Sequence, residues 1–166
     1  DGTHNTVYDV VPSPDGKSVY GVTWSYDSRL FSYDPYDSSE GKMHDLGRAY
    51  GPEIVDWKIF DSANHTGGLV FGDDGCLYFA SYVCWKEPRG MYLIRMDTKT
   101  LKREEIGPIV ADGYHTQYIS KATKDYAGNL FFASCVNRPT RIYEHTPDYV
   151  KEGRSRKKWP IVRKWG

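Results

Sequence analysis

The sequence predicts an all-β protein made of repeated four-stranded antiparallel sheets, and three observations favour this class. Aromatic residues, which suit strands, make up 15% of the 166 residues and include 14 tyrosines. A pattern of histidine, short apolar run, glycine turn and aromatic run occurs three times along the chain. No segment of useful length has the hydrophobic period of about 3.6 residues that marks an amphipathic helix.

The first two strands of each repeat are expected to form a hairpin. Each repeat begins at a histidine and passes through a short run to a turn that ends in glycine, namely Asp15-Gly16, Asp74-Gly75 and Ala127-Gly128. Asp-Gly between two such runs is a strong hairpin signal, because glycine accepts the positive φ of a tight turn. Aromatic residues in phase with the strands are expected to fill the core between repeats: Tyr8, Tyr20, Tyr78, Phe131 and Tyr143.

A third and a fourth strand complete each repeat. The third strand is expected at 29–35, 92–98 and 141–147, and the fourth at 42–46, 102–106 and 159–163. The histidines His4, His65 and His115 recur after 61 and 50 residues, and four short strands in such a period have the size and content of a β-propeller blade. The chain 1–166 is therefore expected to be a single propeller segment with blades at about 4–60, 65–110 and 115–166.

Three blades do not close a propeller, which has at least about four. An open arc would leave the apolar flanks of its terminal blades in water, where they promote aggregation. We therefore expect a partial propeller, completed either by the remaining blades of a longer parent protein or by self-assembly.

Charge and composition exclude several classes of protein. The 22 basic and 22 acidic residues give a formal net charge of zero, so a general nucleic-acid binder is not expected. No run of 18 apolar residues exists, so no membrane partner is expected. The motifs of NTPases, serine hydrolases and common metalloproteases are missing from the sequence. Cys76, Cys84 and Cys135 do not have the spacing of a disulfide framework or a zinc ribbon, and buried thiols are expected.

Polar and aromatic residues are predicted to converge on one face of the blades. The innermost strand of a blade starts on the face that also holds the loop between its second and third strands, so His4, His65 and His115 should ring the axis there. Loops on that face carry the other candidates: Trp24 in the first blade, Tyr82, Cys84, Trp85 and Arg89 in the second, and Cys135, Asn137 and Arg138 in the third. Such residues suit a site for a polar, anionic ligand.

Two other interpretations of the three histidines stay open. A residue that recurs at one repeat position can be structural and tie adjacent blades together by hydrogen bonds. The imidazoles of His4, His65 and His115 could instead hold a zinc or calcium ion, with Cys84 or Cys135 as a further zinc ligand. Their spacing is not that of a local zinc motif.

The second repeat resembles a known enzyme family. Residues 64–78, NHTGGLVFGDDGCLY, and the histidines that begin the blades are similar to those of the β-propeller polysaccharide lyases, in particular the ulvan lyases. The resemblance implies a seven-bladed propeller that cleaves a uronate-containing polysaccharide by β-elimination, of which this chain would span three blades. It also implies a His or Arg that neutralises the uronate carboxylate, a His or Tyr that removes the C5 proton and, in some members, a zinc ion held by His and Cys. Sugar-dehydrogenase and lactonase propellers have a similar core motif.

This chemistry suits the candidate residues. Removing a proton next to a carboxylate requires that its charge be screened and that a base titrate near the working pH, as His does. The expected roles are base for His65 or His115, acid for Tyr82 or Tyr118, neutralising group for Arg89 or Arg138, and substrate binding for His4, Trp85 and Asn137.

The expected substrate is an acidic polysaccharide and the expected location is secreted or periplasmic. Two alternatives remain. A non-catalytic glycan- or protein-binding propeller would use the same rim aromatics without an ordered His-Tyr-Arg geometry. A metal-dependent lactonase-type propeller would need acidic ligands at the axis, where this sequence places histidine.

Overall fold

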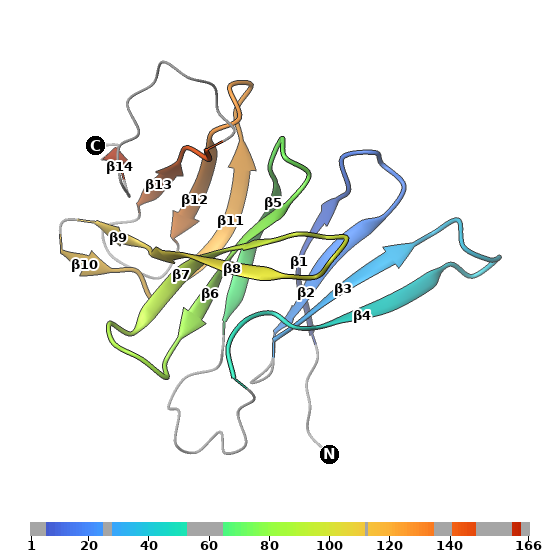
Figure 1. The fold of residues 1–166 in the computed structure, drawn as a ribbon, viewed down its shortest axis with the longest axis horizontal. Coiled ribbons are helices and arrows are strands. Elements are labelled where there is room, and N and C mark those ends of the chain that lie inside the picture. Colours follow the sequence, from blue (N-terminus) through green and yellow to red (C-terminus); the bar gives the residue numbers. More distant parts are fainter. Residues whose placement is uncertain are drawn as a thin grey trace.

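The structure is a computed structural model that describes residues 6–24, 28–52, 65–111, 113–134, 141–148 and 161–163. Every regular element in these ranges is a β-strand, and they contain no helix that could cross a membrane. The strands form three antiparallel four-stranded sheets and one two-stranded hairpin, which confirms the all-β class. Figure 1 shows the three sheets side by side in chain order, with the second sheet between the other two.

Each four-stranded sheet is a meander in which consecutive strands are neighbours. The first contains β1 (Thr6–Pro12), β2 (Val19–Trp24), β3 (Arg29–Asp34) and β4 (Lys42–Arg48). The second contains β5 (Thr66–Phe71), β6 (Leu77–Val83), β7 (Gly90–Met96) and β8 (Arg103–Pro108). The third contains β11 (Ile119–Lys124), β12 (Leu130–Ser134), β13 (Ile142–His145) and β14 (Ile161–Arg163). A short hairpin of β9 (Val110–Ala111) and β10 (Tyr114–His115), which the repeat pattern does not indicate, precedes the third sheet.

The first hairpin of each sheet closes through the same turn. Gly16, Gly75 and Gly128 have φ values of 69°, 73° and 84°, and each N–H donates to the carbonyl three residues earlier. An aspartate beside each turn, Asp15, Asp74 or Asp125, accepts the backbone N–H two residues further on. The turns predicted from the glycines are therefore present, and a carboxylate supports each one.

The second sheet is covered on both faces. Strands β5, β6 and β7 are buried along almost their whole length, which explains why they are nearly continuous apolar runs rather than alternating ones. Leu77, Phe79 and Ile94 pack towards the first sheet. The opposite face packs towards the third sheet through residues that alternate with these: Tyr78, Ala80 and Leu93.

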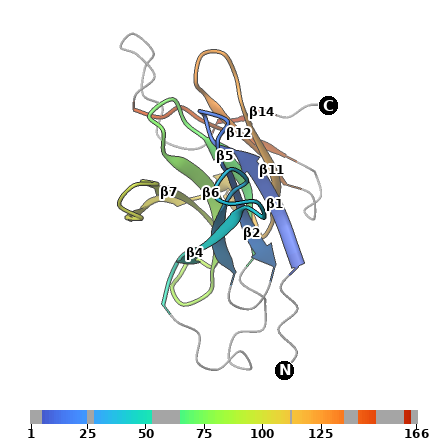
Figure 2. The same ribbon diagram turned by 90° about the vertical axis from the view of Figure 1, so that its right-hand side faces the viewer.

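The strands β1, β5 and β11 lie close together, and in the turned view β1 and β11 are on the side away from β7 (Figure 2). The pairing register shifts in each of them, between Val7 and Asp9, between Gly67 and Val70, and between Ile119 and Lys121. Such a bulge frees backbone groups from the ladder and re-aims side chains.

Asp9 connects the three sheets at these bulges. Its buried carboxylate accepts the backbone N–H of Leu69, in the irregular part of β5, at 3.0 Å. It also forms an ion pair with the ammonium of Lys121 on β11. One carboxylate therefore fixes β1 against both of its neighbours, directly beside Tyr8.

Candidate functional site

Four ring side chains from three sheets meet at one end of the molecule. Tyr8 lies in β1, Trp24 ends β2, and His65 and Tyr118 directly precede β5 and β11. The centroid of the Tyr8 ring is 5.5 Å from that of Trp24 and 6.0 Å from that of Tyr118. The centroid of the His65 ring is 5.3 Å from that of Trp24 and 5.1 Å from that of Tyr118. We call these four residues the aromatic–histidine cluster.

The cluster holds a neutral base beside two coupled hydroxyl groups. Burial lowers the pKa of His65 below its ordinary value, so its imidazole is uncharged at neutral pH and can accept a proton. The hydroxyls of Tyr8 and Tyr118 share a hydrogen bond. Trp24 is 44% exposed, which leaves one edge of the cluster open to solvent.

The backbone of His65 is fixed by the second sheet. Its carbonyl accepts the N–H of Tyr82 at 2.8 Å, which continues the β5–β6 pairing beyond the first residue of β5. Next along the chain, the hydroxyls of Thr66 and Ser81 are hydrogen bonded at 3.0 Å inside the core. The imidazole is therefore carried by an ordered strand end rather than by a long loop.

His115 differs from its expected position at the start of an innermost strand. It lies in β10, and the residue that directly precedes β11 is Tyr118. The N–H of Met91, which is opposite Tyr82, donates to the carbonyl of Thr116 at 2.7 Å. The chain at Thr116 is thus about three strand spacings, roughly 14 Å, from that at His65. His115 therefore lies near the outer flank of the second sheet and not at the axis.

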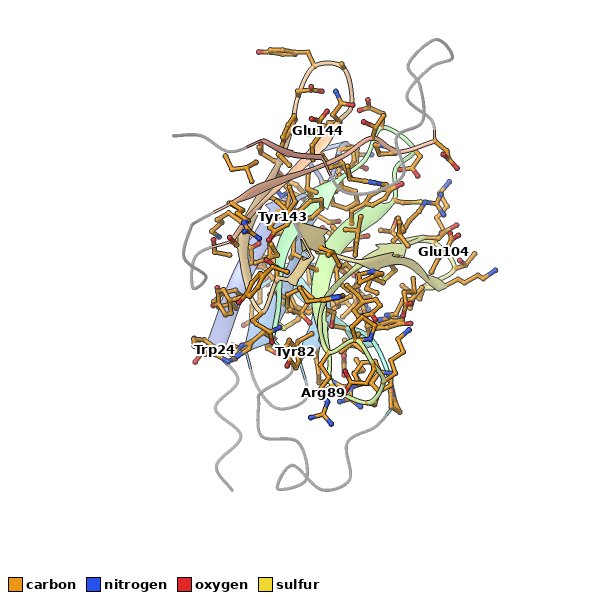
Figure 3. All side chains as sticks on the ribbon, turned by 90° about the vertical axis from the view of Figure 1, so that its left-hand side faces the viewer. Trp24, Tyr82, Arg89, Glu104, Tyr143 and Glu144 are labelled. Carbon is orange, nitrogen blue, oxygen red and sulfur yellow. The ribbon has the colours of Figure 1, made fainter. Side chains whose placement is uncertain are left out.

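The other candidates of the second sheet have different surroundings, although Figure 3 shows Trp24, Tyr82 and Arg89 at the same end of the molecule. Tyr82 is only 8% exposed and packs in the core towards the third sheet. Arg89 is exposed, and its Nε lies 3.1 Å from a carboxylate oxygen of Glu87. Trp85 packs against Tyr50, with ring centroids 5.8 Å apart. The ring of Tyr118 thus contacts the imidazole of His65, whereas Tyr82 is bonded to His65 through its backbone N–H.

The cysteines of the described chain are buried thiols, as expected. Cys76 and Cys84 are buried and form no disulfide, and burial raises the pKa of both thiols, which favours the protonated form over the thiolate that binds metals. In the described ranges no group of three or more His, Cys, Asp or Glu residues is arranged to hold a metal ion. The candidates His4, Cys135, Asn137 and Arg138 lie outside the described residues.

Sequence reasoning assigned Tyr8 only to the core and gave Trp24 no specific role. Its position at the end of a second strand had already placed Trp24 on the face of His65, although no role followed from that position. Tyr8 had no such signal, since its direction depends on the bulge in β1.

Chemically, the cluster can accept a proton at His65, donate one from the Tyr8–Tyr118 pair, and offer the face of Trp24 to a sugar ring. Comparisons with models of known families and with curated proteins find no match to this chain.

Proposed function

We propose that the aromatic–histidine cluster is the active site of a polysaccharide lyase, which cleaves a uronate-containing acidic polysaccharide by β-elimination. The observation that supports this most directly is the neutral imidazole of His65, 5.1 Å between ring centroids from a tyrosine whose hydroxyl is itself hydrogen bonded. A base and an acid next to each other are what the elimination requires. A polymeric substrate of this kind favours a secreted or periplasmic enzyme.

In the proposed reaction His65 removes the proton from C5 of the uronate. The electron pair of that C–H bond forms the double bond between C4 and C5, and the bond from C4 to the glycosidic oxygen breaks. Tyr118 gives its proton to the departing oxygen, and Tyr8 stabilises the resulting phenolate through the shared hydrogen bond. The products are an unsaturated uronate and a shortened chain.

The group that neutralises the uronate carboxylate is Arg89 or Arg138. Arg89 is 63% exposed in its ion pair with Glu87, and such a surface pair contributes little free energy. The guanidinium can therefore exchange Glu87 for a substrate carboxylate at small cost.

A non-catalytic glycan-binding site is the second candidate, and the exposed ring of Trp24 favours it. Aromatic faces bind sugars by stacking, and this needs no proton transfer. The two candidates differ in the role of His65. In a lyase, removal of the imidazole lowers the rate of cleavage, whereas in a glycan-binding site it can lower only the affinity for the polymer.

The protein should be incubated with ulvan, pectate, alginate and glycosaminoglycans while the near-ultraviolet absorbance of the unsaturated uronate is followed. We expect one polymer to be cleaved, His65→Ala to lower kcat at least about 100-fold, and Tyr118→Phe to lower it as well. His44→Ala, an exposed histidine in β4, is the matched control and should keep the wild-type rate.

The acid limb of the kcat/KM profile should lie below pH 6.5, because His65 must be neutral and its pKa is lowered. A wild-type rate in His65→Ala would exclude the assigned role. Binding of a polymer without cleavage, weakened by Trp24→Ala, would establish the glycan-binding alternative.

A further inference from the structure

The hairpin of β9 and β10 presents an exposed aromatic ring beside a cation. Tyr114, in β10, is 44% exposed, the same fraction as Trp24 in the aromatic–histidine cluster. The guanidinium carbon of Arg141, directly before β13, lies over the Tyr114 ring at 5.4 Å from its centroid. Figure 1 shows the hairpin at the margin of the molecule, next to the start of β13. Because second-to-third strand connections lie on the face where innermost strands begin, this pair is at the same end of the molecule as the cluster.

The base of this hairpin is fixed to both neighbouring sheets. Thr116, which directly follows β10, accepts the N–H of Met91 at 2.7 Å and donates its own N–H to the carbonyl of Ile109 at 3.1 Å. The Thr116 hydroxyl is hydrogen bonded to the hydroxyl of Tyr143 in the third sheet. Thr116, Ile109 and Tyr143 are completely buried. The hairpin therefore holds Tyr114 in place, and a ligand that binds this ring does not have to order a loop.

A polar segment connects Tyr114 with the cluster. Residues 115–117 are His, Thr and Gln, and the next residue is Tyr118. Gly90 lets this segment lie directly against the start of β7, because a Cβ at Gly90 would come within 2.9 Å of the Thr116 carbonyl oxygen. The segment therefore forms a path of polar groups across the end of the second sheet, from the cluster to the hairpin.

Tyr114 and Arg141 together suit one sugar of an acidic polymer. A tyrosine ring offers a rigid, flat surface at a low cost in conformational entropy. A guanidinium has five N–H donors, so it can contact an aromatic ring and also bind a carboxylate through two of them. A uronate has both the ring and the carboxylate that such a pair recognises.

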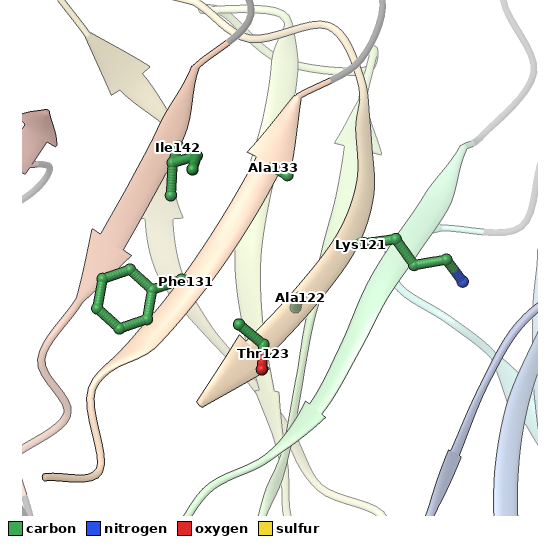
Figure 4. Close-up of a pocket in the computed structure, with 6 residues that line it drawn as sticks. All are labelled: Lys121, Ala122, Thr123, Phe131, Ala133 and Ile142. Atoms are coloured by element: carbon green, nitrogen blue, oxygen red, sulfur yellow. The ribbon is translucent and has the colours of Figure 1, made fainter. Parts of the chain in front are cut away.

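The hollow on the outer face of the third sheet lacks these features. Apolar side chains, among them Ala122, Phe131 and Ile142, form most of its lining (Figure 4). The cation in its lining, Lys121, already pairs with the carboxylate of Asp9. An acidic polymer therefore fits the hairpin better than the hollow.

We propose that Tyr114 and Arg141 form an outer subsite for the acidic polysaccharide, where the ring stacks on a sugar and the guanidinium binds the carboxylate of a uronate other than the one that is cleaved. The chain at Thr116 is roughly 14 Å from that at His65, so the subsite takes a sugar separate from the reacting one. This inference rests on the proposed function, because both sites bind the same polymer. It predicts a preference for long chains with repeated carboxylates over short fragments.

The first test measures binding without cleavage. Isothermal titration calorimetry is carried out with ulvan, pectate, alginate and glycosaminoglycans on proteins that carry His65→Ala, so that the polymer stays intact. We expect Tyr114→Ala and Arg141→Gln each to weaken the binding of a polymer about 10-fold. Arg141→Lys should weaken it less, because the positive charge is kept. Once the carboxylates of the polymer are reduced to alcohols, Arg141→Gln should no longer change the affinity.

The matched controls are Tyr36→Ala and Lys99→Gln. Both residues are exposed, and they lie in the turns between the third and fourth strands of their sheets, at the end opposite the hairpin. Neither change should alter the affinity. Circular dichroism of each variant, with an unchanged strand spectrum, separates loss of binding from loss of folding.

The second test measures cleavage with His65 intact. On the long polymer, Tyr114→Ala and Arg141→Gln should raise KM about 10-fold and leave kcat unchanged, because the pair binds the substrate and does not touch the reacting atoms. On the shortest fragment that is cleaved, both variants should keep the wild-type kcat and KM, since that fragment does not reach the hairpin.

The outcomes separate the outer subsite from the proposed active site. Wild-type affinity and KM in Tyr114→Ala and Arg141→Gln would overturn the subsite, even where His65→Ala abolishes cleavage. An equal loss on the shortest fragment would also overturn it, because the pair would then act on the active site itself. Polymer binding that depends on Arg141 and on the carboxylates, without any cleavage, would support the subsite and overturn the lyase. Failure to bind any of the polymers would overturn both.

Discussion

The hydroxyl of Tyr8 is hydrogen bonded to the hydroxyl of Tyr118, although 110 residues separate them in the chain. The bond joins the first and third sheets directly beside His65, so it links the stability of the assembled sheets to the geometry of the site. Because both partners are side chains, each can lose its hydroxyl with little change in shape.

We expect Tyr8→Phe and Tyr118→Phe each to lower the free energy of unfolding by about 1 kcal/mol. The double variant should cost little more than either single change, since the second hydroxyl has no further bond to lose within the pair. Urea unfolding of the four proteins measures this coupling. Additive effects of the two changes would mean that the hydroxyls do not interact in solution. The control is Tyr36→Phe, at an exposed turn, which should leave the free energy of unfolding unchanged.

Removal of the Asp9 carboxylate should be more costly. Asp9→Ala leaves the N–H of Leu69 without its acceptor and Lys121 without its ion-pair partner, at a side chain that is only 5% exposed. We expect a loss of about 2–3 kcal/mol in the free energy of unfolding, together with a change in Trp24 fluorescence as Tyr8 shifts.

The matched control for this change is Asp37→Ala. The Asp37 carboxylate lies 3.7 Å from the ammonium of Lys42, and both side chains are at least half exposed. Its removal should cost less than about 1 kcal/mol. Equal losses in the two variants would show that Asp9 does not hold the three inner strands together.

Stability should decline in mild acid because of His145. This residue is 9% exposed in β13, its ring is 5.9 Å from that of Tyr78, and burial lowers its pKa to about 4. The unfolded chain binds the proton with a pKa near 6.5, so protonation favours unfolding as the pH falls from 6.5 to 4. At pH 4 the free energy of unfolding should be about 3 kcal/mol lower than at neutral pH. Above pH 6.5 His145 is neutral in both states, so it does not affect stability there.

Chemical unfolding between pH 7.5 and 4 measures this decline. His145→Gln should make the slope shallower, while His44→Gln, at an exposed position of β4, should leave it unchanged. The same slope in His145→Gln and in wild type would assign the acid sensitivity to other groups, of which the half-buried His65 is the first to test.

The repeat of four strands could be read from the sequence because its signals are local. The Asp74-Gly75 turn needs only a glycine at positive φ and a carboxylate in reach of the next amides. The burial of Tyr78 and Tyr143 was also predictable, since both alternate in phase with strands that pack on a neighbouring sheet. Phe131 has the same phase, but its neighbour would be a further blade, and so it lines an open face instead.

The sequence alone determined the strands, their turns and the face on which His65 stands, because these depend on residues a few positions apart. Only the tertiary structure decided which groups surround that imidazole. The bulge in β1 directs Tyr8 and Asp9 towards the neighbouring sheets. The hairpin of β9 and β10 displaces His115 and leaves Tyr118 directly before β11. These positions depend on how strands distant in sequence pack against each other. The local periodicity of the sequence does not predict that packing.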